Sequence, residues 1–396
     1  MTTSKKLFLG AFLVLITVPF FGRLALRGTT PGIVLPSENR TITAFTMPKK
    51  TFRRSILREW FVNNDRWITD RLAKREKVIT SVNALLANPK WFTSSDFSKG
   101  LFGKEGFLFL GNSYEGVIDR HFSPQFTIGK EGEANLVNYH KTLQSVAKEV
   151  GAFYIVFAAP DKHGIYCEKF ASWATGGNAC KRVNMVTNRF KALLEREGIP
   201  VSYPFEEIRK ANGETIYYKA DTHWKRTGAE IGFKTLMKNL ADRGVKFSGE
   251  PYRPVPPGIY SFEKRPIGLA GDLRNIIGVP RDFKNDDYDI VLKSNEPVLY
   301  SVNGATPARV PAEQALVNGV GLKWISIAQN EAAPNKARVL VFGDSFSTAM
   351  GPFFHFYFTE TRYYARHGRD YEAMKAAIRE VKPDIVVYET VERGLR

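Results

Sequence analysis

The C-terminal part of the chain constrains the fold most, because mostly apolar runs alternate there with an amphipathic stretch. The runs "ARVLVFGDS" and "PDIVVYET" are rich in valine and predict strands buried on both faces, and "RYYARHG" predicts a further strand. The stretch "DYEAMKAAIREV" places its apolar residues at helical spacing. Strands buried on both faces need helices above and below them, so this pattern predicts an α/β sandwich with a largely parallel sheet.

The same alternation extends toward the N-terminus. Helices are predicted over residues 133–150, 181–197 and 225–244, and buried strands in "AFYIVFAAPDK" and "GIPVSYPF". The segment "LFGKEGFLFLGN" predicts two strands joined by a turn, and the Pro/Gly-rich region from about residue 248 to 335 predicts β-structure. With 396 residues, 43% of them hydrophobic, the chain can bury a large core.

The first residues predict export. Lys5 and Lys6 precede an apolar run over residues 7–21, which is typical of an export signal. The run is shorter than the ~20 residues that span a bilayer comfortably, as in a signal peptide, yet no small-residue cleavage site follows it, so an uncleaved signal anchor is preferred. We divide the chain into a signal peptide or signal anchor (1–28), a linker with an N-terminal helical region (29–99) and a main domain (100–396).

The chain carries a formal net charge of +17, from 57 Lys+Arg against 40 Asp+Glu. Such a surplus attracts an acidic polymer, a membrane surface or nucleic acid. Export makes nucleic acid an unsuitable partner, which leaves the membrane surface or a polymer.

Two cysteines, Cys167 and Cys180, are the whole cysteine content of the chain. An even count in an exported protein predicts a disulfide between them, which would stabilise the fold by roughly 3 kcal/mol. The alternative is two free thiols or a metal site, but the histidine and cysteine partners that zinc needs are missing nearby.

Ser345 follows an apolar run and the pair Gly343–Asp344, where a strand ends and the chain turns. In α/β folds catalytic groups gather at the carboxyl ends of strands, and the N–H of Ser345 could help to bind an oxyanion there. Gly343 suits an unusual backbone angle in that turn. The alternative is that Ser345 is only the N-cap of an ordinary helix, because Gly, Asp and Ser are common turn and cap residues.

A nucleophilic serine needs a histidine base and a group that orients it, and "DTHW" offers both. Asp221 stands two residues before His223, so in an extended segment both side chains point to the same side. The alternative is that Asp221 only caps the following helix while His223 packs on Trp224. The other five histidines lack such a carboxylate, with the exception of His163.

Asp161 and His163 follow a predicted strand and form the second candidate pair, and Lys162 between them suggests binding of an anionic group. We name Lys162, Trp224 and Asp161 as candidate substrate-binding residues.

Taken together, "GKEGFLFLGN", "APDKHGIYCEKF", "DTHW", "VFGDSFS" and "KPDIVVYETVERGL" resemble the alginate O-acetyltransferase family of the AlgJ/AlgX type. The resemblance spans most of residues 100–396 and implies an SGNH hydrolase-like, three-layer α/β/α catalytic domain. The serine motif follows the Asp–His motif here, which implies the circularly permuted motif order of that family. It also implies Ser345 as nucleophile, His223 as base and Asp221 as its orienting partner.

The implied activity is acetyl transfer to hydroxyls of an exported polysaccharide, through an acetyl-serine, in the periplasm. The implied partners are a polysaccharide acceptor, neutral or anionic, and a membrane-bound O-acyltransferase that relays the acetyl group, with the inner membrane holding the N-terminal segment. The sequence shows no nucleotide-binding loop or metal cluster, so we expect no cofactor and no metal. Two alternatives stay open: a secreted carbohydrate acetylesterase with the same triad, and a polysaccharide-binding or assembly protein without catalysis.

Overall fold

A computed structural model of the chain describes residues 99–123, 126–170, 179–181, 183–211, 213, 216–247, 250–267, 271–277, 287–315, 325–365 and 371–395, besides two short strands near the N-terminus. These strands, β1 (Val34–Leu35) and β2 (Arg40–Thr41), pair antiparallel. The chain divides into two compact units, of which the first holds Met1–Thr93 and Asp272–Lys284, including α10 (Asp272–Ile277). The second unit holds Ser94–Gly271 and Asn285–Arg396.

The predicted signal segment (1–28) lies outside the described residues, as does nearly all of the predicted linker and helical region (29–99). Among the helices that the structure describes, none is long and apolar enough to cross a membrane.

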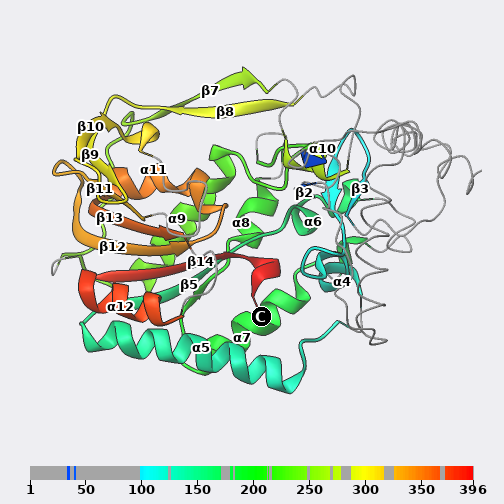
Figure 1. Cartoon of the computed structure of the whole chain (residues 1–396), viewed down its shortest axis with the longest axis horizontal. Coiled ribbons are helices and arrows are strands. Elements are labelled where there is room, and N and C mark those ends of the chain that lie inside the picture. Colours follow the sequence, from blue (N-terminus) through cyan, green and yellow to red (C-terminus); the bar gives the residue numbers. More distant parts are fainter. Residues whose placement is uncertain are drawn as a thin grey trace, which may run out of the picture. The chain divides into compact units, whose positions relative to one another are not determined.

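An eight-stranded sheet forms the core of the second unit, in the order β10-β9-β11-β13-β12-β14-β5-β6 (Figure 1). Its bounds are β5 (Phe153–Ala159), β6 (Val201–Ser202), β9 (Pro297–Val302), β10 (Ala308–Pro311), β11 (Ile325–Gln329), β12 (Asn335–Gly343), β13 (Phe358–Ala365) and β14 (Ile385–Val391). The strands from β13 to β6 run parallel, whereas β9, β10 and β11 pair antiparallel. The prediction of a largely parallel sheet therefore holds for five strands and fails for the β9–β11 edge.

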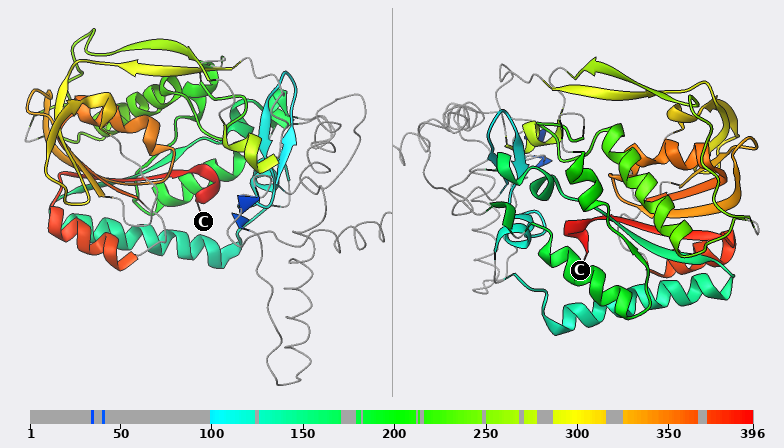
Figure 2. Two further views of the ribbon diagram at one scale, coloured as in Figure 1. Left: turned by 45° about the horizontal axis from the view of Figure 1, so that its top comes forward. Right: turned by 180° about the vertical axis from the view of Figure 1, so that it is seen from behind.

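Helices cover both faces of this sheet. On one face α5 (Gly129–Glu149) packs against α12 (Tyr371–Val381), and on the other α9 (Arg226–Asp242) packs against α11 (Ser347–Tyr357) (Figures 1 and 2). Every residue of β14 is buried, which explains its nearly continuous apolar sequence. The predicted mixed α/β core is confirmed, and α11 is a helix for which the sequence pattern gave no range.

Smaller elements complete the second unit. They are β3 (Gly100–Phe102), β4 (Leu108–Leu110), α4 (Val117–Phe122), α6 (Lys162–Ile165), α7 (Met185–Arg196), α8 (Phe205–Lys210), β7 (Ser261–Pro266), β8 (Tyr288–Lys293) and, among the described residues, the 3-10 turns η1 (Cys167–Lys169), η3 (Ala179–Lys181), η4 (Ala312–Gln314) and η5 (Glu392–Gly394). The predicted strand pair is β3 and β4, which are antiparallel. Cys167 and Cys180 are joined by a disulfide.

Candidate active site

The turn after β12 is held by two carboxylates. One oxygen of Asp344 accepts the N–H of Phe346 at 2.9 Å and the other accepts the N–H of Val391 at 2.8 Å. Glu389, fully buried on β14, accepts the N–H of Asp344 at 2.9 Å and the hydroxyl of Ser347 at 2.5 Å. Asp344 and Glu389 thus supply the hydrogen bonds that fix the start of α11, so Ser345 is not needed as its cap.

Gly343 is required in this turn by close packing. A Cβ atom built on Gly343 would lie 2.0 Å from Oγ of Ser347 and 2.8 Å from the ring of Tyr363. Its φ is not among the positive ones, so the expected unusual backbone angle is wrong. The missing side chain, not the backbone freedom of glycine, lets β12 approach α11.

The structure brings Ser345, His223 and Asp221 together. Nε2 of His223 lies 2.7 Å from Oγ of Ser345, and its Nδ1 lies 2.6 Å from a carboxylate oxygen of Asp221. The same oxygen accepts the backbone N–H of His223 at 2.9 Å, which fixes the pair as a local turn. With Nδ1–H donating to Asp221, Nε2 accepts the hydrogen bond of the serine hydroxyl and can take its proton. These groups have the geometry of a hydroxyl nucleophile, a base and a carboxylate that orients the base.

Trp224 and Phe346 connect the two motifs. The indole N–H of the buried Trp224 donates to the carbonyl of Phe346 at 2.9 Å, and the Phe346 ring lies 5.1 Å from the His223 ring. Trp224 also lines the pocket beside Ser345, where a substrate would meet only the small exposed part of its side chain.

Two buried lysines hold the loop that carries Asp221 and His223. The ammonium of Lys162 donates to the carbonyl oxygens of Lys219 and Asp221 at 2.7 and 2.9 Å. The carboxylate of Asp287 accepts the N–H of Lys219 at 2.5 Å and pairs with the ammonium of Lys225 at 2.6 Å. Buried charged groups thus hold both backbone carbonyls and a backbone N–H of this loop.

Lys162 and Asp161, proposed from the sequence to bind substrate, lie outside the pocket lining. Lys162 is 2% exposed, and its ammonium faces the rings of Phe107 and Phe109 besides the loop carbonyls. Asp161 is 1% exposed and pairs with the guanidinium of Arg393. Both side chains are therefore engaged inside the fold.

Asp161 belongs to a buried polar cluster with His121, Glu392 and Arg393. Nε2 of His121 lies 3.4 Å from Asp161 and 3.3 Å from Glu392, and its Nδ1 lies 2.5 Å from the carbonyl of Val183. Burial opposes protonation of His121, but the charges of Glu392 and Asp161 outweigh it and raise the pKa of the imidazole. Burial likewise opposes ionisation of Asp161, but Arg393 and His121 hold its pKa below the usual range.

The carboxylate of Glu392 has its own donors in this cluster. It accepts the hydroxyls of Tyr203 at 2.5 Å and Thr187 at 2.8 Å, and the N–H of Asp161 at 2.6 Å. Although His121, Asp161 and Glu392 lie close enough to share a cation, protein donors already engage their carboxylates. The donor set therefore has the character of an ion-pair network.

His163 lies beside this cluster and not in the active site. Burial and the charge of His121 lower its pKa to about 3, so the ring is neutral at neutral pH. Its Nε2 lies 2.9 Å from the carbonyl of Leu110. The second Asp–His pair considered from the sequence is thus part of the interior.

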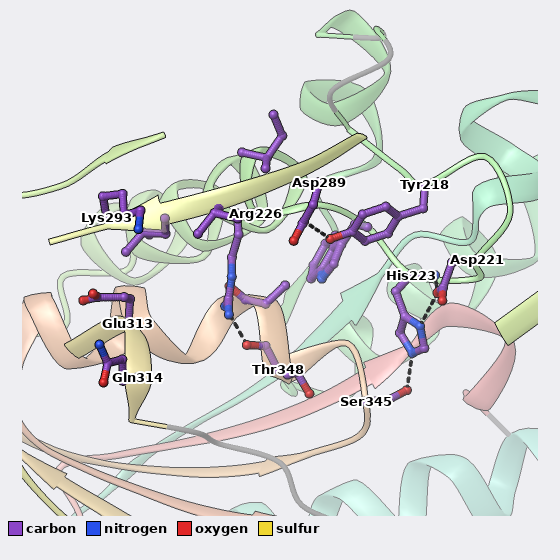
Figure 3. A pocket seen from close by; sticks show the side chains of 15 residues that line it. Tyr218, Asp221, His223, Arg226, Asp289, Lys293, Glu313, Gln314, Ser345 and Thr348 are labelled. Atoms are coloured by element: carbon purple, nitrogen blue, oxygen red, sulfur yellow. Dashed lines mark hydrogen bonds and ion pairs between the residues drawn. The ribbon is translucent and has the colours of Figure 1, made fainter. Parts of the chain in front are cut away.

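A pocket of about 520 Å³ opens beside Ser345 (Figure 3). The side chains of Ser345, His223 and Asp221 lie at one end of the labelled row, and Lys293, Glu313 and Gln314 lie at the other. The complete lining is Tyr218, Asp221, His223, Trp224, Arg226, Asp289, Ile290, Val291, Leu292, Lys293, Glu313, Gln314, Ser345, Thr348 and Ala349.

Glu389, Arg226 and Asp289 are site residues that were not predicted from the sequence. Glu389 leaves a signal, since it is an acidic residue inside the otherwise apolar strand "IVVYETV". Nothing in the sequence distinguishes Arg226 or Asp289, because a charged residue is common at the start of a helix and in a half-exposed strand.

Residues 101–293 match the family described as "SGNH hydrolase-like domain, acetyltransferase AlgX". The probable alginate O-acetylase AlgJ of Pseudomonas fluorescens is 34% identical over 76 residues, which are 19% of this chain and 18% of that protein. Ser345 lies outside the part matched by the family.

Among solved structures, Bacillus cereus PatB1 with a sulfonyl adduct covers 70% of this chain and 94% of its own, at 16% identity and a TM-score of 0.51. The O-acetyltransferase domain of Pseudomonas putida AlgJ covers 75% of this chain and 92% of its own, at 18% identity and a TM-score of 0.47. The likeness to PatB1 concerns the fold alone. The family match agrees with the resemblance seen in the sequence: residues 101–293 are similar to the SGNH hydrolase-like domain of the acetyltransferase AlgX, and a shorter segment is similar to AlgJ.

Proposed function

We propose that this protein is an exported O-acetyltransferase that moves an acetyl group onto hydroxyls of an exopolysaccharide through an acetyl-serine. The observation that carries the proposal is the hydrogen-bonded series Asp221–His223–Ser345, whose three residues line one pocket. The Asp–His motif precedes the serine motif in the chain, which agrees with a circularly permuted SGNH arrangement.

In the first half-reaction Oγ of Ser345 passes its proton to Nε2 of His223 and attacks the acetyl carbonyl of the donor. Among the described residues the N–H of Ser345 donates to no protein acceptor, so it is available to the oxyanion that forms. The intermediate collapses, the donor oxygen leaves with the proton from His223, and the acetyl group stays on Ser345. Asp221 keeps the imidazole in the tautomer that this step needs and stabilises its positive charge.

In the second half-reaction a sugar hydroxyl gives its proton to His223 and attacks the acetyl carbonyl. The bond between Oγ of Ser345 and the acetyl group breaks, and Oγ recovers a proton from His223. Water in place of the sugar would give acetate, which is the reaction of an acetylesterase. A pocket next to the serine supports transfer, because it can hold the sugar and keep its hydroxyl close.

An N-terminal signal anchor would hold the enzyme at the periplasmic face of the inner membrane, and a membrane-bound O-acyltransferase would supply the acetyl donor there. The basic run ahead of residues 7–21 supports this location.

The test is Ser345→Ala in the full-length chain, with p-nitrophenyl acetate as donor and oligosaccharides as acceptors. We expect loss of p-nitrophenol release and of acetylated product by at least about 1,000-fold, since residues of one catalytic unit fail together. Ser301→Ala, a change of the same kind in β9, is the matched control and keeps full activity. Substantial activity of Ser345→Ala would refute the mechanism, and acetate without acetylated sugar would favour the esterase.

A further inference from the structure

The pocket extends beyond the groups that the proposed mechanism uses. Arg226 from the start of α9, Asp289 and Lys293 from β8, and Glu313 and Gln314 from η4 form what we call the distal arm of the pocket. Figure 3 shows these side chains continuing away from Ser345 on both sides of the space. Their polar groups converge from three elements that are far apart in the sequence.

The acidic groups of the distal arm have unused acceptor capacity. Asp289 accepts the hydroxyl of Tyr218 with one oxygen, and its other oxygen has no protein donor among the described residues. One oxygen of Glu313 is buried and, within the described part of the chain, has no hydrogen-bond partner. A carboxylate oxygen without a protein donor can accept a hydrogen bond from a ligand that offers O–H or N–H groups.

The basic groups, in contrast, are already occupied. One nitrogen of Arg226 donates to the carbonyls of Thr348 and Ala349 at 2.7 and 2.8 Å. The charges of Asp289 and Glu313 both act on the same guanidinium. Lys293 lies 3.8 Å from Glu263 on the neighbouring strand β7. The cations of the arm are therefore compensated by protein groups.

The pocket lining contains one more carboxylate than cations. The carboxylates are Asp221, Asp289 and Glu313, and the cations are Arg226 and Lys293. The site is thus slightly acidic although the whole chain carries +17. A negatively charged sugar would bring its own carboxylate close to two others, whereas a sugar hydroxyl donates to them.

We propose that the distal arm is the acceptor subsite and that it selects an uncharged hexose chain over a polyuronate. This inference rests on the proposed function, because it names the acceptor for the same serine. Asp289 and Glu313 accept hydrogen bonds from hydroxyl groups of the sugar that lies next to the acetylated one. The positive charge of the chain then serves contacts elsewhere than in the pocket.

The first experiment measures binding, so that it does not depend on turnover. Full-length Ser345→Ala protein is titrated with cellohexaose and with a mannuronate hexamer at equal ionic strength, and affinity is measured by calorimetry. We expect the neutral hexamer to bind at least about tenfold more tightly. Equal affinities, or tighter binding of the uronate, would overturn the proposal whether or not the protein transfers acetyl groups.

The second experiment assigns the preference to the arm. In the Ser345→Ala background, Glu313→Gln keeps the shape and removes the charge, so we expect the neutral-to-uronate affinity ratio to fall about fivefold or more. Asp242→Asn at the exposed end of α9 is the matched control and leaves the ratio as it was. Asp289→Asn repeats the test if the Glu313 variant unfolds. A ratio that neither variant changes would refute the role of these carboxylates.

The proposed catalytic function is refuted by different results from those that refute the acceptor preference. If the wild-type protein releases no p-nitrophenol from p-nitrophenyl acetate, or if Ser345→Ala releases it equally well, the catalytic assignment is wrong. The affinity ratio still decides whether the arm prefers a neutral glycan.

Discussion

Replacing Lys162 by methionine distinguishes two roles for this residue. The sequence suggested that Lys162 binds an anionic group of the substrate, whereas its ammonium lies buried and donates to the carbonyls of Lys219 and Asp221. Methionine preserves most of the side-chain volume and packs well against the rings of Phe107 and Phe109. The substitution therefore removes the charge and the two hydrogen bonds with little change in packing.

The magnitude follows from those two hydrogen bonds. A hydrogen bond to a charged group contributes about 1.5–3 kcal/mol, and a buried carbonyl left without a donor costs about 1–3 kcal/mol. Part of this is recovered because the buried ammonium no longer has to be desolvated. We expect the free energy of unfolding to fall by about 2–4 kcal/mol. The loop that holds Asp221 loosens, so kcat should fall about 10- to 100-fold while KM for p-nitrophenyl acetate changes little.

Urea unfolding and steady-state release of p-nitrophenol measure the two effects. Lys104→Met is the matched control, because Lys104 also donates to a backbone carbonyl, that of Glu168 at 3.2 Å, but is exposed. It should change stability by less than about 0.5 kcal/mol. Lys162→Arg tests whether a charge alone restores kcat. A Lys162→Met protein with normal stability and kcat but a raised KM for an anionic acceptor would refute the positioning role and support substrate binding.

Three further outcomes are expected. Gly343→Ala should lower stability by more than about 2 kcal/mol and abolish ester cleavage, because its Cβ would lie 2.0 Å from Oγ of Ser347; normal activity would show that the turn can shift. Burial lowers the pKa of His355 to about 4 from an unfolded value near 6.5, so the folded state resists protonation and stability is lost as pH falls through that window. Between pH 7 and 5 His355 should cost about 2 kcal/mol of unfolding free energy, and His355→Phe should be less acid-sensitive by that amount in urea titrations. Reducing the bond between Cys167 and Cys180, which are 13 residues apart, should lower stability by about 3 kcal/mol, and mass spectrometry of the alkylated protein checks that the bond forms.

The sequence by itself determined the elements whose burial is local. Runs such as "ARVLVFGDS" and "PDIVVYET" have to be covered on both faces, so β12, β14 and the helices α5, α9 and α12 follow from periodicity alone. The pairing of Asp221 with His223 was equally local, because two residues in one short turn cannot lie far apart.

The antiparallel edge of β9, β10 and β11 was not predictable in the same way. Strand direction depends on how the connections cross the sheet, and residues 248–335 carry Pro and Gly without a clear period. The residue pattern of a strand says little about which strand, far away in the sequence, it pairs with.

Tertiary structure decided which polar groups meet. Ser345 and His223 stand 122 residues apart and come within 2.7 Å only because the serine turn and the "DTHW" loop lie side by side above the sheet. Lys162 is an example of the opposite outcome. A lysine next to an aspartate suggested an exposed anion site, but the packing of the fold buries this side chain. The type of a charged side chain limits which groups it can bind. Whether its partner is solvent, substrate or a backbone carbonyl depends on how the elements around it pack.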